Sequence, residues 1–226
     1  RQEWQPGQAT RCNKCSGIRP ERTHHCGASG VCALRMDHYC PWTATCIGFH
    51  NHKFFILLAT YNCLSVFVFF VTTLPVSYWV VKEWLVLGLE DVERVIQAVL
   101  VLLTMLVSAV LSYLLGDMVR DHASRAFRNV TSIEEHYDNM PNPYDLGDRW
   151  LNVAQLFGTF GVDWFLPVTP WNPVCDGISF ARSGEEFHGS EPGDVELEDD
   201  DRPECEELWH RRYIENHAAG RLQHFH

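Results

Sequence analysis

Residues 54–81 read FFILLATYNCLSVFVFFVTTLPVSYWVV and contain no charged side chain. A helix needs about 20 apolar residues to cross the hydrocarbon core of a bilayer, so this run is long enough to span it. A second apolar run occupies residues 92–116, and its few polar interruptions (Glu93, Arg94 and Gln97) lie near its start. Buried helices of a soluble core are the alternative interpretation. Because the two runs are joined by the short connection 82–91, a transmembrane helical hairpin is favoured.

The charges that flank the two runs predict their orientation. Basic side chains lie at the outer ends, with Lys53 before the first run and Arg120, Arg125 and Arg128 after the second. The connection 82–91 carries Lys82 but also Glu83, Glu90 and Asp91. By the positive-inside rule, residues 1–53 and the juxtamembrane region 117–180 are expected to face the cytosol, with residues 82–91 on the opposite side.

Residues 1–53 hold six of the nine cysteines, between Cys12 and Cys46, interleaved with histidines. The segment shows no sustained hydrophobic period, so it cannot fold on apolar burial alone. This clustering indicates a zinc site in a reducing compartment, and a secreted disulfide protein is the competing interpretation. A loop-rich lobe of this size is expected to fold around the metal.

The rest of the composition restricts the remaining classes. The formal net charge is −11, which argues against a nucleic-acid partner because phosphate binding needs a basic face. Residues 181–226 are rich in glycine and acidic side chains and include the run Glu198–Asp201. Such a segment is typical of a solvated, disordered tail.

The residues between Cys32 and Cys46 carry a possible nucleophile. Asp37-His38-Tyr39-Cys40 is followed by Pro41-Trp42. A carboxylate can orient an imidazole, which can draw the proton from a thiol and leave a nucleophilic thiolate. From spacing alone, the alternative is that Cys40 is a further zinc ligand.

The stretch from Cys12 to Phe54 resembles the cysteine-rich domain of the DHHC family of protein palmitoyltransferases. The matching segments are Cys12-x2-Cys15, Arg19-Pro20-Glu21-Arg22, His24-His25-Cys26, Cys32, Met36–Trp42 and Cys46–Phe54. Thr131-Ser132-Ile133-Glu134 resembles the family's Thr-Thr-x-Glu motif, and Asn142–Gly147 with Asn152 and Leu156-Phe157-Gly158 resembles its carboxyl-terminal aromatic and Asn element. The resemblance covers roughly residues 12–171. It implies a mostly helical membrane protein of four spans, of which the last two are present here and the first two would lie upstream of Arg1.

The resemblance also implies a two-step reaction. Cys40, activated by His38 with Asp37 holding the imidazole, would take the acyl group of palmitoyl-CoA as a thioester. A free cysteine of a cytosolic or membrane-associated substrate protein would then accept it. Arg19, Arg22 and Lys53 are candidates for the CoA phosphates, with ordinary juxtamembrane charges as the alternative.

Two zinc sites are usual in the family. The first ligand set is complete as Cys12, Cys15, His25 and Cys32, but the second keeps only Cys26 and Cys46 and has Ser29 and Tyr39 at its other two positions. The sequence therefore predicts one zinc, with Ser29 and Tyr39 hydrogen-bonding where the second would lie. Some fungal members carry the same Asp-His-Tyr-Cys version, so Tyr39 does not by itself indicate an inactive enzyme.

Three other functions compete with the acyltransferase. A zinc-stabilised membrane scaffold would need the zinc ligands but not a reactive His38 or Cys40. A nucleic-acid-binding zinc finger and a secreted disulfide protein are the other two. Glu134 and Asn152 are expected to support the cytosolic lobe rather than to act in chemistry.

Overall fold

The computed structural model describes residues 10–87, 92–137, 142–178 and 180–183. The chain divides into two compact units, one made of residues 1–55 and 124–226 and the other of residues 56–123. The described part of the first unit is called the cysteine-rich lobe below, and the second unit is called the helix pair. Residues 1–53 and the part of the predicted juxtamembrane region 117–180 from residue 124 onward thus belong to one compact unit. Nearly all of the predicted acidic tail 181–226 lies outside the described residues.

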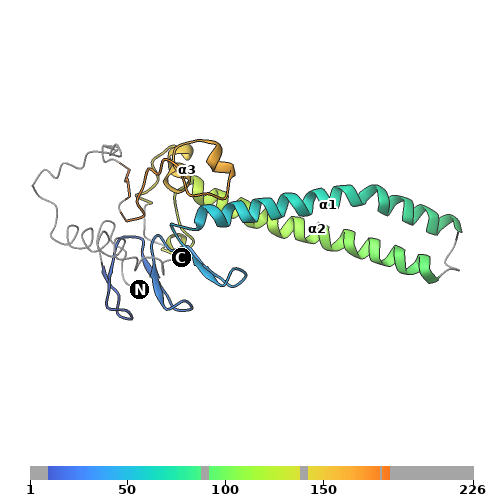
Figure 1. Cartoon of the computed structure of the whole chain (residues 1–226), viewed down its shortest axis with the longest axis horizontal. Helices are drawn as coiled ribbons and strands as arrows, with labels where there is room; N and C mark the ends of the chain where they lie inside the picture. The colour runs from blue at the N-terminus through green and yellow to red at the C-terminus, as the bar shows by residue number, and fades with distance from the viewer. Residues whose placement is uncertain (1–9, 88–91, 138–141, 179, 184–226) are drawn as a thin grey trace, which may run out of the picture. The chain divides into compact units, whose positions relative to one another are not determined.

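Three short antiparallel hairpins form the amino-terminal part of the cysteine-rich lobe (Figure 1). They are β1 Thr10–Arg11 with β2 Ile18–Arg19, β3 His24–Cys26 with β4 Val31–Ala33, and β5 His38–Cys40 with β6 Thr45–Ile47. Gly48 follows the last hairpin, and a Cβ there would lie only 2.6 Å from the carbonyl oxygen of Leu34. The close approach of these two backbone segments therefore needs glycine.

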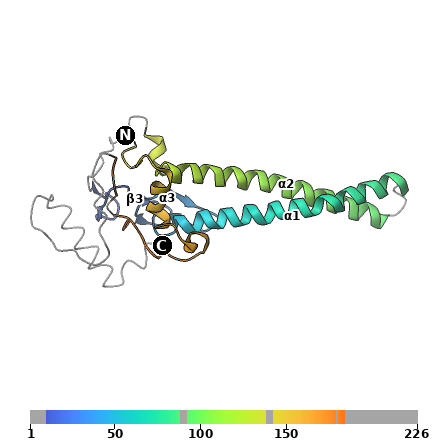
Figure 2. The ribbon, with the colours of Figure 1, turned by 90° about the horizontal axis from the view of Figure 1, so that it is seen from above.

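The carboxyl-terminal part of the lobe supplies most of its apolar core. It contains the 3-10 turns η1 Glu134–His136 and η2 Val162–Phe165 and the helix α3 Arg149–Phe157 (Figures 1 and 2). Asp148 caps α3, because its side chain accepts hydrogen bonds from the backbone N–H groups of Trp150 and Leu151. The buried apolar side chains of this part are Tyr144, Val153, Leu156, Phe157, Trp164, Ile178 and Phe180.

Two long helices, α1 His52–Leu87 and α2 Val92–Phe127, have 36 residues each. Between residues 56 and 123 they run side by side in opposite directions (Figures 1 and 2). Their most apolar windows have mean hydropathies of 2.2 and 2.5, and both are apolar enough to cross a membrane. Each helix extends beyond the run predicted for it, 54–81 or 92–116. A helix of this length measures about 54 Å, against about 30 Å for the hydrocarbon core, so membrane crossing needs only part of it.

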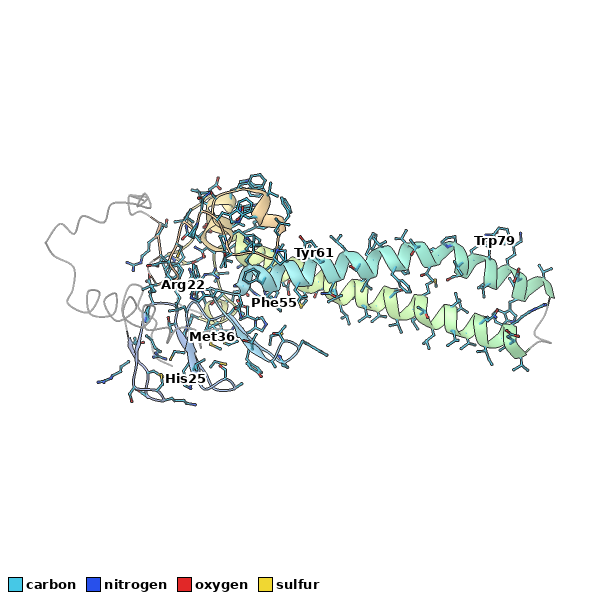
Figure 3. All side chains as sticks on the ribbon, in the orientation of Figure 1. Arg22, His25, Met36, Phe55, Tyr61 and Trp79 are labelled. Atoms are coloured by element: carbon cyan, nitrogen blue, oxygen red, sulfur yellow. The ribbon has the colours of Figure 1, made fainter. Side chains whose placement is uncertain are left out.

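Several hydroxyl side chains of the helix pair hydrogen-bond within their own helices. Thr60 donates to the carbonyl oxygen of Ile56, and Thr104 donates to that of Leu100. Gly116 lies against the other helix, because a Cβ added there would be 3.8 Å from the sulfur of Cys63. Large side chains such as Tyr61 and Trp79 are exposed on α1 (Figure 3). Hydrogen bonds within a helix and small residues between helices are typical of helices that cross a bilayer.

Candidate active site and zinc centre

The β5–β6 hairpin decides which side chains of Asp37-His38-Tyr39-Cys40 can act together. Its register pairs His38 with Ile47, Tyr39 with Cys46 and Cys40 with Thr45. Side chains alternate between the two faces of a strand, so His38 and Cys40 share one face and Tyr39 points to the other. Tyr39 therefore lies on the face of the hairpin opposite His38 and Cys40.

Asp37 is buried immediately before β5 and holds the imidazole of His38. Its Oδ2 lies 2.7 Å from Nδ1 of His38. Its other carboxylate oxygen accepts a hydrogen bond of 2.8 Å from the backbone N–H of Ser132, and its carbonyl oxygen accepts one from the Ser132 hydroxyl. Sequence reasoning missed Ser132. It recognised the motif containing Ser132 but gave it no contact with the active site.

The imidazole of His38 is poised to accept a proton. The hydrogen bond to Asp37 raises its pKa, and partial burial opposes this shift. The ring of Phe55, at the start of α1, packs edge-on against it with the centroids 5.1 Å apart (Figure 3 labels Phe55). Asp37 and Phe55 together fix the orientation of the ring, and that orientation leaves Nε2 as the nitrogen for proton transfer.

The thiol of Cys40 is buried but surrounded by hydrogen-bonding groups. Burial works to raise its pKa, but hydrogen bonds from the side chain and backbone of Thr43, the backbone of Trp42 and the side chain of His38 outweigh it. The pKa of Cys40 is therefore lower than that of an ordinary cysteine, as a nucleophilic thiol requires.

Four side chains from the first two hairpins meet at one point: Cys12, Cys15, His25 and Cys32, whose ligand atoms all lie within 4.8 Å of one another. The sulfur of Cys15 lies 3.3 Å from that of Cys32, and the sulfur of Cys12 lies 3.5 Å from Nδ1 of His25 (Figure 3 labels His25). Ligands around a tetrahedral zinc are separated by roughly 3.4–3.8 Å, so the three thiols and the imidazole fit this metal.

Cys26 and Cys46 form a separate pair. Both are buried, their side chains hydrogen-bond each other, and Ser29 hydrogen-bonds Cys26. Burial raises the pKa of Cys46 to about 12. Among the described residues, this pair belongs to no group of three or more His, Cys, Asp or Glu side chains that could hold a metal ion. Two thiols and a hydroxyl suit a hydrogen-bonded pair better than a second tetrahedral zinc site.

Arg22, one of the three predicted candidates for the CoA phosphates, is buried inside the lobe. Its guanidinium is buried and forms a two-pronged ion pair with Glu134, with distances of 2.8 and 2.9 Å (Figure 3 labels Arg22). Its Nη1 donates to Oδ1 of Asn129, its Nη2 also donates to the carbonyl oxygen of Asn129, and its guanidinium carbon lies 4.0 Å from the centroid of the Tyr144 ring. The guanidinium thus makes four hydrogen bonds inside the buried lobe, which argues against the predicted contact between Arg22 and a CoA phosphate.

The other two phosphate candidates differ from each other. Lys53 is buried, with Nζ 3.6 Å from Oδ2 of Asp163, and burial lowers its pKa despite that carboxylate. It is therefore positioned for a structural ion pair. Arg19 is partly exposed on β2, where its Nε donates to the Thr10 hydroxyl at 3.1 Å. Arg19 is the one of the three candidates whose head group is available at the surface.

Glu134 and Asn152 tie distant segments of the lobe together. Glu134 accepts from the backbone N–H of Thr131, whose hydroxyl accepts in turn from the N–H of Glu134, a reciprocal pair like a capping box. The Asn152 amide donates to the carbonyl oxygen of Phe127 at 2.9 Å and to Asp145 at 2.7 Å. These contacts agree with the supporting role expected for both residues.

Comparison with known proteins gives consistent matches. The model of the DHHC palmitoyltransferase family matches residues 5–139. Palmitoyltransferase ZDHHC2 of Danio rerio is 30% identical over 175 residues, which are 75% of this chain and 46% of the relative. Probable protein S-acyltransferase 13 of Arabidopsis thaliana is 32% identical over 183 residues, 77% of this chain and 58% of the relative. Palmitoyltransferase PFA3 of Candida albicans is 49% identical over 74 residues, 33% of this chain and 20% of the relative. The chain spans about half the length of the first two of these relatives.

Proposed function

The chain belongs to the DHHC palmitoyltransferase family, and we propose on this basis that it carries the catalytic centre of a protein S-acyltransferase with Cys40 as the acyl-bearing thiol. The observation that supports this most directly is the arrangement of Asp37, His38 and Cys40. The carboxylate holds the imidazole at 2.7 Å, and the imidazole hydrogen-bonds the thiol. This is a nucleophile with a base and a group that orients the base.

In the first step, Cys40 attacks the carbonyl carbon of a fatty acyl-CoA thioester such as palmitoyl-CoA. His38 takes the thiol proton as the new sulfur–carbon bond forms, and the bond to the CoA sulfur breaks. The proton then passes to the departing CoA thiolate. Asp37 stabilises the imidazolium that exists in between.

In the second step, the thiol of a substrate-protein cysteine attacks the Cys40 thioester. His38 accepts the incoming proton and returns it to the Cys40 sulfur as that sulfur leaves. One thioester replaces another in each step, so the donor thioester is the only energy source needed. The scheme is covalent catalysis of the ping-pong type.

Zinc has a structural role in this proposal. Cys12, Cys15, His25 and Cys32 would hold one ion, which would supply the cross-link that two small hairpins without an apolar core need for folding. None of these ligands belongs to β5, which carries His38 and Cys40. The metal would fix the lobe that presents the active site, while the proton and the acyl group are handled by residues 37–40.

We further propose that α1 and α2 are two spans of a multi-pass integral membrane protein whose cysteine-rich lobe faces the cytosol. The flanking arginines and the crowded free thiols of the lobe both support this orientation. Substrates would be cytosolic or membrane-associated proteins with free cysteines. Among the CoA-phosphate candidates, the surface position of Arg19 makes it the one that remains.

Acyl-biotin exchange on the protein expressed in membranes tests the proposal. With palmitoyl-CoA supplied, a hydroxylamine-sensitive acyl signal is expected in the unchanged chain and is expected to vanish in Cys40→Ser. His38→Ala should reduce the rate of acylation by about 10²–10⁴-fold, the usual range for a general base. Cys63→Ser, which removes a thiol on α1, is the matched control and should keep the signal.

A Cys40→Ser variant that keeps the full signal would remove Cys40 from the chemistry. A folded, zinc-loaded protein with no acyl signal in the unchanged chain would favour the competing function, a zinc-stabilised membrane scaffold.

A further inference from the structure

The three hairpins of the cysteine-rich lobe share one five-residue turn, which we call the cysteine turn because a cysteine begins it. The three cysteine turns are residues 12–16, 26–30 and 40–44. The fifth residue of each lies in the left-handed backbone region, with φ of 57°, 73° and 51° in chain order. In the first two turns its N–H donates to the carbonyl oxygen of the cysteine at 2.9 Å, and in the third the N–H of Ala44 donates to that of Pro41 at 3.3 Å. Cys40 therefore begins the third turn of a repeated structural unit.

The cysteine turn directs backbone N–H groups at the sulfur of its first residue. In the first turn the N–H of Lys14 donates to Sγ of Cys12 at 3.4 Å. In the second turn the third and fourth residues hydrogen-bond the cysteine through their backbones. In the third turn the backbones of Trp42 and Thr43 do the same for Cys40. Convergent N–H groups of this kind favour a negatively charged sulfur, whether or not it binds a metal.

The fourth residue of the turn determines which side chain meets that sulfur. In the first turn it is Cys15, a member of the zinc ligand set. In the second turn it is Ser29, whose side chain hydrogen-bonds Cys26. In the third turn it is Thr43, whose side chain hydrogen-bonds Cys40. A hydroxyl group thus lies beside the Cys40 sulfur at the position where the first turn has a metal-ligating thiol.

A hydroxyl donor at this position distinguishes between the states of the Cys40 sulfur. Hydrogen bonds to an ionised acceptor are about twice as strong as those between neutral groups, so a thiolate gains more from the donor than a thiol or a thioester does. In the reaction proposed above, the sulfur carries negative charge as it attacks the acyl donor and again as it leaves in the second step. A group that stabilises this charge selectively lowers the barrier of both steps.

We propose that Thr43 is a further catalytic residue, whose hydroxyl donates to the Cys40 sulfur while that sulfur is a thiolate. The role rests on the proposed function, because it assigns the hydroxyl to the two acyl-transfer steps. Thr43 is exposed at the tip of the β5–β6 hairpin, so its side chain is not part of the buried core of the lobe. Its contact with Cys40 is therefore a property that a substitution can remove without opening a cavity.

Alkylation of Cys40 in the whole chain, held in phosphatidylcholine vesicles, tests this proposal without an acyl donor. The protein would be exposed briefly to iodoacetamide at a series of pH values, and the modified Cys40 peptide would be quantified by mass spectrometry. Thr43→Val keeps the shape of the side chain but removes the hydroxyl, whereas Thr43→Ser keeps the hydroxyl. Ser29→Ala removes the hydroxyl at the same position of the second turn and is the matched control. His38, the titratable neighbour of the thiol, is unchanged in every variant.

Thr43→Val is expected to slow the alkylation of Cys40 about tenfold at about pH 7, because the thiolate loses a charge-assisted hydrogen bond. The midpoint of the alkylation profile should move to higher pH. Thr43→Ser and Ser29→Ala should stay within about twofold of the unchanged chain, as expected for exposed positions that keep the Thr43 contact or lie outside it. Single-turnover acylation of Cys40 should follow the same order among the variants.

An unchanged alkylation profile in Thr43→Val would overturn the proposal. An equal loss in Thr43→Ser would overturn it as well, because the shape of threonine rather than its hydroxyl would then be what Cys40 needs. Alkylation requires no acyl-CoA, so this role of Thr43 and the proposed function can fail separately. Loss of acylation in Cys40→Ser alone, with every Thr43 variant at the rate of the unchanged chain, would keep the acyltransferase and reject the hydroxyl.

Discussion

Asp37 illustrates how one side chain sets the protonation of another. Its carboxylate contacts His38 at 2.7 Å and the backbone N–H of Ser132 at 2.8 Å, and the first contact raises the pKa of the imidazole. Asp37→Asn would remove the negative charge and lower that pKa. The neutral imidazole that acts as base would then persist to lower pH. The rising limb of the pH–rate profile for Cys40 acylation should therefore move to lower pH.

The same Asp37→Asn variant should also reduce the maximal acylation rate, by about 10²–10⁴-fold, because the imidazolium loses its partner and the ring its orientation. Single-turnover acylation would be measured between about pH 5.5 and 9, because the ordinary pKa values of His and Cys are about 6.5 and 8.5. The rate and the position of the rising limb would show both effects. A lower rate with an unmoved pH profile would mean that Asp37 serves folding only.

Tyr39 occupies the motif without sharing the catalytic face. It pairs with Cys46 across the β5–β6 hairpin, whereas His38 and Cys40 point to the other side. Tyr39→Phe removes only the hydroxyl, so we expect Cys40 acylation to stay within about twofold of the unchanged chain. A loss comparable with that of His38→Ala in the same assay would assign the hydroxyl a direct part in the reaction.

The first two hairpins, β1–β2 and β3–β4, converge on one set of zinc ligands. We expect one zinc per chain by element analysis of the purified protein. Cys32→Ser should reduce the zinc content well below one, because it removes a thiolate from the complete set. Cys46→Ser is the matched control from the Cys26–Cys46 pair and should leave the content at one. Two zincs in the unchanged chain, with one lost in Cys46→Ser, would show that the pair is a second metal site.

A buried ion pair joins the amino-terminal and carboxyl-terminal parts of the lobe. It is formed by Arg22, which precedes β3, and Glu134 in η1. Removing one partner of a buried pair leaves an unpaired charge, so Glu134→Gln should destabilise the lobe by about 3–5 kcal/mol. Glu135→Gln is the matched control. Its partly exposed pairing with Arg125 and Arg128 should contribute about 0–1 kcal/mol. Thermal unfolding in detergent would compare the two.

The Arg22–Glu134 ion pair also predicts how the stability of the lobe responds to acid. Burial of Glu134 works to raise its pKa, but Arg22 outweighs burial and holds the pKa below the ordinary value of 4.5. A depressed pKa contributes stability that is present above 4.5 and is lost as pH falls through the lowered pKa. Glu134→Gln should abolish this part of the acid sensitivity. If Glu134→Gln and Glu135→Gln lost equal stability, the buried Arg22–Glu134 pair would contribute no more than a partly exposed ion pair.

The sequence predicted those features that depend on residues close together along the chain. The apolar runs gave both long helices, and the spacing of the cysteines identified four side chains that converge. The contacts that organise the site are not local: Asp37 meets Ser132, and Arg22 meets Glu134, across 95 and 112 positions. An arginine looks the same in a sequence whether it faces solvent or a buried carboxylate. The sequence therefore offers Arg22 both as a candidate for the CoA phosphates and as an ordinary juxtamembrane charge. The helices also extend past the apolar runs, because polar residues continue a helix once it has formed.

The cysteine-rich lobe is formed by two segments, one before and one after the helix pair in the sequence. This arrangement restricts the topology of the whole chain. Residues 1–55 and 124–226 form one compact unit, although residues 56–123 separate them in the sequence. Only an even number of membrane crossings between the two parts allows them to fold together. Two crossings satisfy this condition, and the flanking arginines favour the cytosol for the shared side.

Asn129-Val130-Thr131 gives this topology a built-in reporter, because it is an acceptor sequence for N-glycosylation. Asn129 is fully buried, its Nδ2 donates to the Tyr144 carbonyl oxygen at 3.0 Å, and its Oδ1 accepts from Arg22 and Arg35. A glycan on that nitrogen could not fit the folded lobe.

A lobe that stays in the cytosol never meets the glycosylation machinery, so the chain should keep its unmodified mass when it is made in the presence of microsomes. A Gly/Ser insertion carrying an Asn-Gly-Ser acceptor in the connection 82–91 should be modified, with a mass shift that an endoglycosidase removes. A mass shift in the unchanged chain that Asn129→Asp abolishes would place the lobe on the luminal side, where the substrates proposed here could not reach Cys40.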